Sequence, residues 1–371
     1  MYCTLARLFR IVSHPSPYPR KKLLARPSHT RTIVTASSVP WYLVASVLIG
    51  LPATLWSYKC LMMILFQRKI LYMGFLPPGS RTTKIDKTNW LLRGLDMKEL
   101  EFPSIGPDGK GVILRGLELS QERPASSNRL TTKKSDSHPD RVLIYLQGNM
   151  GSPVSRLPLF RQLLLSDRSP FSSGHTKLLI VPPRSFYLST NTRPTQPGLL
   201  NDYRTVLEYA WANYPQSRIV LYGHSLGGTA ICCMLSELKH DEESNSVEGV
   251  VLENAFPSVK RMITQSLYPS RYLPYHYLTP FVFDPWDALS ALETSHPHSL
   301  LYNTPILFLS GSKDSLVLPS MGKEMFEAAR LRNGTILRRW VLVEGKGHDD
   351  VWQKSTFWGM EVGSFLKEIQ R

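Results

Sequence analysis

The stretch from Arg218 to His240 limits what this chain can fold into more than any other, because a strand, a sharp turn and a helix follow one another within it. The apolar run Ile219–Tyr222 leads into Gly223-His224-Ser225-Leu226-Gly227, and small and apolar residues at helical spacing come next. A side chain on either glycine would collide with neighbouring backbone in so sharp a turn. The pattern predicts that Ser225 is held out of the sheet as a nucleophile, and that the amide of Leu226 points at an oxyanion beside it.

The alternative for this stretch is a glycine-rich turn with an idle serine. Five residues alone would not exclude that alternative, but their position between a buried-type strand and a helix favours the nucleophile. His224, which precedes the serine, is expected to be a packed neighbour rather than a catalytic base. The reason is that a strand-to-helix turn sends adjacent side chains in different directions.

Apolar runs of strand length alternate with helical segments along the rest of the chain. The predicted strands are Val142–Leu146, Lys177–Val181, Ile219–Tyr222, Val250–Leu252, Ile306–Leu309 and Trp340–Val343. The predicted helices are Val154–Leu165, Leu199–Asn213, the segment after Ser225, Met321–Leu331 and Phe357–Ile369. A hairpin of Lys98–Phe102 and Gly111–Leu119, turning at Pro107-Asp108-Gly109, precedes them. The pattern indicates an α/β fold with a mostly parallel central sheet and helices on both faces.

A serine nucleophile needs a base, and the base needs an acid that orients it. In a chain with this strand-to-helix turn, the acid and then the histidine follow the serine, each after a strand. Asp314 follows the strand ILFLS and His348 follows the strand WVLVEG. We therefore predict Ser225, Asp314 and His348 as the catalytic residues. The alternatives are Glu253 as the acid, or a helix-capping Asp314 with His348 on the surface.

The loop after the strand VLIYL is expected to supply a second donor to the oxyanion. It reads Gln147-Gly148-Asn149-Met150-Gly151. We predict that the backbone amides of Asn149 and Leu226 form the oxyanion hole. Between Asn254 and Thr304 no strand pattern occurs, and aromatic residues and prolines are frequent. Residues 255–304 are therefore expected to form a lid-like insertion above the serine, with a packed excursion as the alternative.

The N-terminal part of the chain differs in composition from the rest. Residues 1–38 are basic and rich in Ser, Thr and Pro, which is typical either of a mitochondrial targeting segment or of a disordered cytosolic tail. Residues 39–66 are almost entirely apolar and predict one transmembrane helix, with Trp41 and Tyr58 among its interfacial aromatic residues. Residues 67–97 are expected to connect it to a domain over residues 98–371. The expected location is a membrane of the endoplasmic reticulum or the mitochondrion.

The net charge of +15 does not indicate a nucleic-acid partner. Of the 44 Lys and Arg residues, 12 lie in residues 1–85, which contain no Asp or Glu, so that residues 86–371 carry 32 basic side chains against 29 acidic ones. A face that binds polyanions would need its positive charge in the folded part. The four cysteines show no metal-type spacing, and no metal or nucleotide cofactor is implied.

Five segments in order carry a resemblance to a known family: YLQGNMGS, YGHSLGG, EGVVLENAFPS, PILFLSGSKDSLVLP and EGKGHDD. From Lys98 onward the chain resembles the α/β-hydrolase superfamily, and more narrowly its membrane-anchored abhydrolase-domain group, which includes lysophosphatidylserine lipase and has monoacylglycerol lipases as wider relatives. The resemblance implies Ser225 as nucleophile, His348 as base and Asp314 as orienting acid.

The chain departs from this group in two loops. Relatives usually have His-Gly-Asn where this chain has Gln147-Gly148-Asn149, and Arg-Gly-Tyr/Trp-Gly where this chain has PPRSFYLST. The second change is expected to alter a pocket wall. The resulting hypothesis is a membrane-anchored serine hydrolase that cleaves carboxylic esters through an acyl-enzyme, with lysophospholipids or monoacylglycerols as substrates. The alternatives are a thioesterase or peptidase with the same triad, and a non-catalytic binding protein with a hydrolase fold.

Overall fold

A computed structural model describes residues 40–106, 109–122, 139–172, 175–240 and 247–370 of the chain. The expected tail or targeting segment, residues 1–38, lies outside the described residues, as do Pro107 and Asp108 of the expected hairpin turn. The chain divides into two units between Pro52 and Ala53, within the first helix. Everything after that helix belongs to the second unit.

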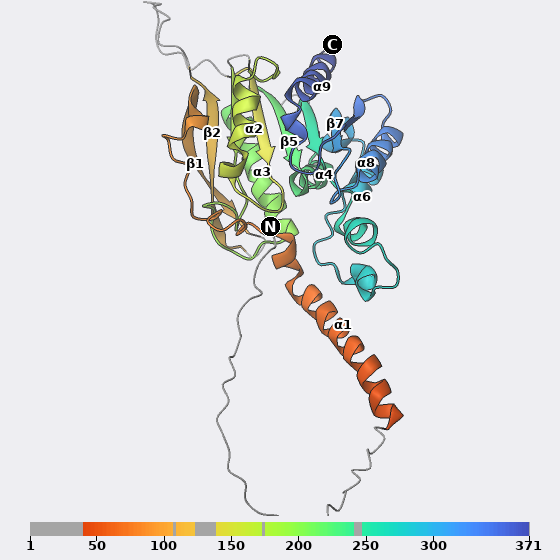
Figure 1. The fold of residues 1–371 in the computed structure, drawn as a ribbon. Coiled ribbons are helices and arrows are strands. Elements are labelled where there is room, and N and C mark those ends of the chain that lie inside the picture. The colour runs from red at the N-terminus through yellow and green to blue at the C-terminus, as the bar shows by residue number, and fades with distance from the viewer. Residues whose placement is uncertain (1–39, 107–108, 123–138, 173–174, 241–246, 371) are drawn as a thin grey trace, which may run out of the picture. The chain divides into compact units, whose positions relative to one another are not determined.

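Eight strands of the described residues form one sheet in the order β1-β2-β4-β3-β5-β6-β7-β8 (Figure 1). Strands β1 and β2 form an antiparallel hairpin, β2 also pairs antiparallel with β4, and the pairs from β4 through β8 are parallel. The strands are β1 (Leu95–Ile105), β2 (Gly111–Gln121), β3 (Arg141–Leu146), β4 (Thr176–Ile180), β5 (Arg218–His224), β6 (Gly249–Glu253), β7 (Ile306–Gly311) and β8 (Arg338–Val343). The predicted mostly parallel sheet is confirmed.

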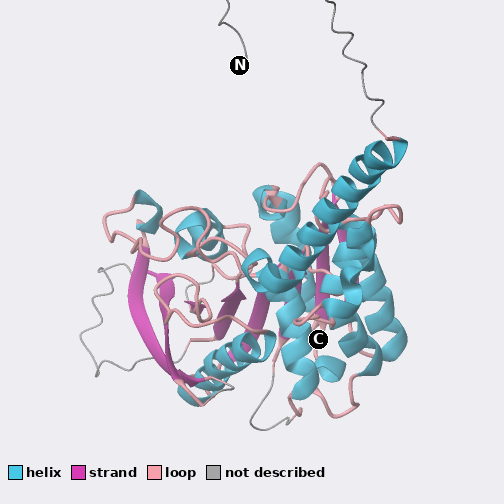
Figure 2. Ribbon diagram, turned by 90° about the horizontal axis from the view of Figure 1, so that it is seen from below, coloured by secondary structure: helices cyan, strands magenta, loops and turns pink. Residues whose placement is uncertain are grey.

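Helices cover both faces of the sheet, as predicted. Alternate residues of a strand point to opposite faces, and Val142 and Ile144 of β3 lie in a different apolar cluster from Leu143 and Tyr145. The first cluster includes helices α3, α4, α6 and α8, and the second includes α2 and α9; Figure 2 shows helices flanking the strands. These helices are α2 (Pro153–Leu165), α3 (Gln196–Asn213), α4 (Leu226–Glu237), α6 (Ala288–Thr294), α8 (Pro319–Arg332) and α9 (Ser355–Glu368).

Helix α3 begins three residues before the predicted start. The side chain of Thr195 accepts a hydrogen bond from the amide of Gly198, at 3.2 Å, and Pro197 lies in the first turn. Both features are typical of a helix N-terminus. The start was predicted too far along the chain because the apolar periodicity begins only at Leu199.

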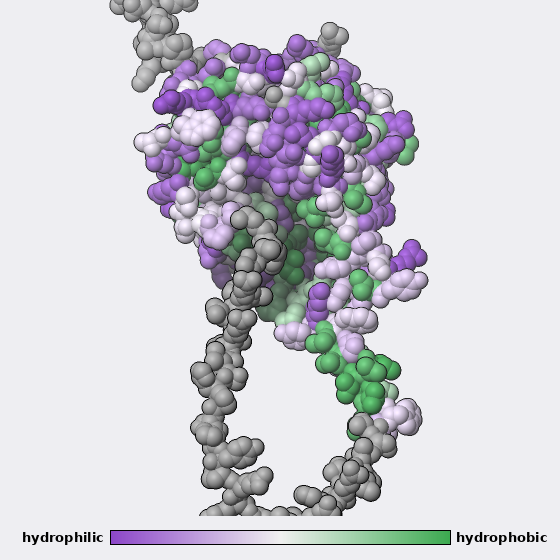
Figure 3. All heavy atoms as spheres, viewed as in Figure 1, coloured by the Kyte–Doolittle hydropathy of each residue, from purple (hydrophilic) through white to green (hydrophobic). Residues whose placement is uncertain are grey.

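Helix α1 (Trp41–Leu71) covers all but the first two residues of the predicted transmembrane segment, 39–66, and extends five residues beyond it. It is the one helix of the described residues that is long and apolar enough to cross a membrane. Its 31 residues correspond to about 46 Å at 1.5 Å per residue, against about 30 Å for a bilayer core. Apolar side chains cover its N-terminal part, which is the group of green spheres at the lower right of Figure 3. The predicted connector, residues 67–97, therefore starts inside the helix and continues through the short helix η1 (Trp90–Leu92).

No strand occurs in the described residues between β6 and β7, where the insertion was predicted. The segment consists of short helical pieces: α5 (Val259–Arg261), η2 (Met262–Leu267), η3 (Pro274–Phe281), α6 and α7 (Leu300–Asn303). Arg68, near the end of α1, forms an ion pair with Asp284 at 2.8 Å, and Gln67 hydrogen-bonds the backbone of Phe281 and Phe283 at 2.9 and 2.7 Å. The insertion therefore packs against the end of α1, and its role as a lid stays a prediction.

Candidate active site

The turn between β5 and α4 holds Ser225 in a conformation that few residues adopt. Its φ is 51° and its ψ is −119°, an angle pair that costs energy for a non-glycine residue. A Cβ on Gly223 would lie 2.5 Å from the Cα of Gly228, and one on Gly227 would lie 2.2 Å from the carbonyl oxygen of Leu146. These contacts are the collisions expected from the sequence, and they explain why both positions are glycine.

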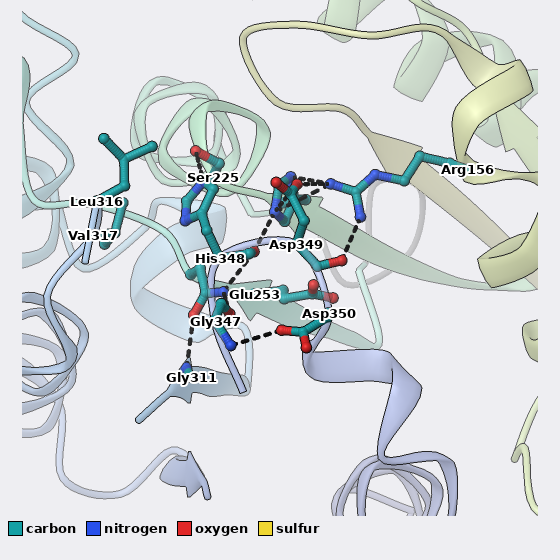
Figure 4. Close-up of polar contacts among 12 residues, drawn as sticks. Arg156, Ser225, Glu253, Gly311, Leu316, Val317, Gly347, His348, Asp349 and Asp350 are labelled. Carbon is teal, nitrogen blue, oxygen red and sulfur yellow. Dashed lines mark hydrogen bonds and ion pairs between the residues drawn. The ribbon is translucent and has the colours of Figure 1, made fainter. Parts of the chain in front are cut away.

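The structure brings the three predicted residues together at the carboxyl ends of their strands. His348 Nε2 lies 3.0 Å from Ser225 Oγ, and His348 Nδ1 lies 2.6 Å from Asp314 Oδ2. Figure 4 shows Ser225 and His348 side by side. Because a carboxylate only accepts hydrogen bonds, Nδ1 carries the proton that is donated to Asp314. Nε2 is then free to accept the proton of the serine hydroxyl.

Backbone amides fix the carboxylate of Asp314. Its Oδ1 accepts from the amides of Leu316 and Val317, at 2.9 and 2.8 Å, and the side chain is fully buried. The alternative acid, Glu253, forms its side-chain hydrogen bond with the hydroxyl of Tyr222 instead. Burial raises the pKa of Glu253 above its ordinary value. Asp314 is therefore the carboxylate in contact with the imidazole.

Asn254 holds the loop that carries His348. Its Nδ2 donates to the carbonyl oxygens of Gly347 and His348, at 3.1 and 2.8 Å, while its Oδ1 accepts from the amide of Gly311 at 2.9 Å. Asn254 directly follows β6 and has a φ of 48°, which asparagine tolerates better than most residues. This role of Asn254 was not predicted from the sequence. The available signal was an Asn at a strand end, which favours a left-handed backbone.

His224 is packed beneath the site, as expected, and is almost fully buried. Arg156 lies 3.1 Å from its Nδ1, and its Nε2 lies 2.9 Å from the carbonyl oxygen of His348. A neutral ring with its proton on Nε2 satisfies both contacts, because Nδ1 then accepts from the guanidinium. Burial, Arg156 and His348 together lower the pKa of His224 well below 6.5. Arg156 also forms an ion pair with Asp349 at 2.6 Å (Figure 4).

The lowered pKa of His224 predicts a loss of stability in mild acid. The unfolded chain binds a proton as the pH falls through 6.5, whereas the folded chain does not, so the free energy of unfolding decreases below that pH. Between pH 7.5 and pH 5.5 this group alone should lower the free energy of unfolding by on the order of 1 kcal/mol. Urea unfolding of wild type and His224→Gln at both pH values measures this change in the free energy of unfolding. The variant should lose less stability on acidification; an equal loss in both proteins would contradict the prediction.

The two predicted oxyanion donors come from neighbouring segments. Leu226 is the first residue of α4, where an amide has no acceptor within the helix. A Cβ on Gly148 would lie 3.5 Å from the Cβ of Ser225 and 3.1 Å from the ring of His224, so the loop after β3 runs beside the serine. Asn149 follows in that loop, and its carbonyl oxygen accepts from the amide of Met73 at 2.7 Å.

Within the described residues, no group of three or more His, Cys, Asp or Glu side chains is arranged to hold a metal ion. The described cysteines Cys60, Cys232 and Cys233 are free thiols. Burial raises the pKa of Cys232 to about 12.

The chain matches no family model, but it is similar to curated proteins over much of its length. It is 27% identical to the protein bem46 of Schizosaccharomyces pombe over 60% of this chain and 71% of that protein. It is 26% identical to the α/β-hydrolase domain-containing protein WAV2 of Arabidopsis thaliana over 73% of this chain and 78% of that protein. A Saccharomyces cerevisiae relative that is named as a membrane protein is 27% identical over 49% of this chain and 58% of its own length.

Solved structures show the same fold. The esterase Pf2001 of Pyrococcus furiosus superposes with a TM-score of 0.53 and 18% identity, covering 78% of this chain and 97% of that one. A likeness at this identity establishes the arrangement of strands and helices. Together with the strand order, it shows that the chain has the α/β-hydrolase fold, and the names of curated relatives such as WAV2 agree with the expected resemblance to the membrane-anchored abhydrolase-domain group.

Proposed function

We propose that this protein is a membrane-anchored serine hydrolase that cleaves carboxylic esters through an acyl-enzyme. The observation that carries the proposal is the unbroken series of contacts from Asp314 through His348 to Ser225. A serine on a strained turn, a histidine within proton-transfer distance and a buried carboxylate behind it are the parts that acyl transfer needs.

In the first half of the reaction, Ser225 Oγ attacks the ester carbonyl carbon while His348 Nε2 takes the hydroxyl proton. The resulting imidazolium is stabilised by Asp314. When the tetrahedral intermediate collapses, the bond to the alcohol breaks and His348 returns the proton to the leaving oxygen. Water then enters and attacks the acyl carbon while His348 takes its proton. When this second intermediate collapses, the bond to Ser225 Oγ breaks, His348 returns the proton to Oγ, and the acid leaves.

The oxyanion of each tetrahedral intermediate would be bound by the amides of Asn149 and Leu226. The amide of Leu226 belongs to the N-terminal turn of α4, where the partial positive charge of the helix favours a negative oxygen. Each donor in such a site contributes about 3 kcal/mol of barrier lowering in other hydrolases. The loop after β3, which contains Asn149, is held in place by its backbone pairing with Met73.

Lysophospholipids or monoacylglycerols are the proposed substrates. Helix α1 would hold the enzyme at a bilayer, and the insertion packed against the end of that helix exposes the aromatic side chains of Tyr272, Tyr277 and Phe281. Both features concentrate the enzyme where lipid esters are found. The basic segment of residues 1–38 motivates a location in the endoplasmic reticulum or the mitochondrion. Unchanged targeting of a fusion without those residues would rule out the targeting segment.

Labelling with a fluorophosphonate tests the proposal directly, because this probe reacts only with an activated serine. The purified full-length wild type should be labelled and Ser225→Ala should not. A panel of lysophospholipid, monoacylglycerol, acyl thioester and peptide then separates the substrate classes. Faster cleavage of the thioester or peptide would identify the alternative hydrolases. A wild type that no probe labels would be a binding protein with a hydrolase fold.

A further inference from the structure

A pocket of about 660 Å³ lies beside the last turns of α1, and Ser225, Asp314 and His348 are not among its lining residues. Three segments form its walls: the end of α1, the chain that follows as far as Arg81, and the loop after β4 from Ser185 to Pro194. That loop includes part of PPRSFYLST, the segment in which this sequence departs from its relatives.

The polar lining of this pocket is strongly basic. It includes four cationic side chains and no acidic one: Arg68, Lys69, Arg81 and Arg193. Arg68 is neutralised by Asp284 at 2.8 Å. The other three form no ion pair with any carboxylate of the described residues. Three uncompensated positive charges around one hollow favour an anionic ligand.

Two buried polar atoms at the same pocket have no hydrogen-bond partner among the described residues. They are Nε of Arg81 and Oγ1 of Thr192. A buried donor without an acceptor costs about 1–3 kcal/mol, so such atoms are rare and need an explanation. Both can donate, and the oxygens of a phosphate group are the acceptors that an arginine and a hydroxyl match.

The apolar part of the lining comes from α1 and the residues after it. Leu65, Phe66 and Phe75 are each about half exposed. Arg68 and Lys69 lie in the last turn of the apolar helix, so that if α1 spans the bilayer, these basic side chains lie at headgroup level and the preceding Leu65 and Phe66 lie toward the acyl chains. A ligand with a phosphate at one end and acyl chains at the other would match both parts.

We propose that this pocket binds the phosphate-bearing headgroup of an anionic membrane lipid, at a site separate from the catalytic centre. The inference rests on the proposed function insofar as it takes α1 to be the membrane anchor. Bound lipid would fix the end of α1 and the segment that follows it. That segment includes Met73, whose amide pairs with Asn149 of the predicted oxyanion loop.

The test uses the full-length chain in dodecyl maltoside with Ser225→Ala as background, so that no acyl-enzyme forms and binding is read independently of catalysis. Dioctanoyl phosphatidic acid, dioctanoylglycerol and inorganic phosphate are titrated by thermophoresis. Arg81→Gln/Arg193→Gln removes two pocket charges. Lys84→Gln/Lys87→Gln is the matched control, because it removes the same charge from exposed residues that do not line the pocket.

Phosphatidic acid should bind, and Arg81→Gln/Arg193→Gln should weaken its affinity by about tenfold or more, as the loss of hydrogen bonds to a charged group does. The lysine control should bind like the background protein, and dioctanoylglycerol should bind at least about tenfold more weakly than phosphatidic acid. Equal affinities in the two double variants would overturn the site. Inorganic phosphate binding as tightly as phosphatidic acid would show a free-anion site and overturn the lipid ligand.

The failure of this inference can be told apart from the failure of the proposed function. With Ser225 intact, fluorophosphonate labelling reports on the catalytic residues whatever the pocket binds. Release of the chain from membranes by alkaline carbonate would refute the anchor. The binding titration still reports on the pocket in either case.

Discussion

Replacing Ser225 with alanine is expected to lower kcat on an ester substrate by about 10⁶-fold. The hydroxyl lies 3.0 Å from His348 Nε2, and without it no acyl-enzyme can form. Residual hydrolysis about 10³- to 10⁴-fold above the uncatalysed rate should remain, because oxyanion donors and substrate binding act without the nucleophile. Hydrolysis of a p-nitrophenyl ester by the purified full-length protein measures both numbers, with an unchanged thermal unfolding midpoint as the control for folding.

Combining Ser225→Ala with His348→Ala tests whether the two residues act as one catalytic unit or contribute independently to kcat. If His348 acts only by accepting the proton of Ser225, then removing both residues should cost about as much as removing either one. Additive losses in the double variant would mean that the histidine works on another step. A Ser225→Ala protein with wild-type turnover would refute the nucleophile altogether.

The sequence predicted those parts of the site that depend on chain order. Asp314 and His348 could be found because each follows an apolar strand, and parallel strands bring their carboxyl ends to one edge. The strands themselves were found because they are apolar on both faces, and their ends were misplaced where polar residues such as Arg218 and Arg338 continue the pairing. Local pattern therefore fixes which elements exist more reliably than where they end.

The residues that support the site could not be predicted in the same way. Asn254 links the last residue of β7 to the loop after β8, and this link exists only because the register β6-β7-β8 places the ends of the three strands side by side. Arg156, in α2, contacts His224. This contact depends on where α2 packs against the sheet, which no short sequence motif encodes. The contact between Gln67 and the insertion joins residues more than 200 positions apart. Such contacts follow from tertiary packing rather than from sequence spacing.

The second large effect is expected from Asp314→Asn, which should lower kcat by about 10⁴-fold while leaving the fold intact. The amide oxygen can still accept from Leu316 and Val317, as Asp314 Oδ1 does. The amide nitrogen then faces His348 Nδ1, 2.6 Å from the position of Oδ2, and donates a hydrogen bond to it. The imidazole is forced to carry its own proton on Nε2, where it can no longer accept the proton of Ser225.

Glu253→Gln is the matched comparison, because Glu253 is the other buried carboxyl near the site and the substitution likewise replaces a carboxyl by an amide of the same size. Its side chain contacts Tyr222 and not the imidazole, and burial already favours its neutral form, which glutamine resembles. The loss in kcat should stay within about tenfold, or about 1.4 kcal/mol. A 10⁴-fold loss in Glu253→Gln together with a small one in Asp314→Asn would reassign the orienting acid. Steady-state kinetics of both variants on one ester decide between the two carboxylates, since only the one that fixes the tautomer of His348 can change proton transfer without changing the fold.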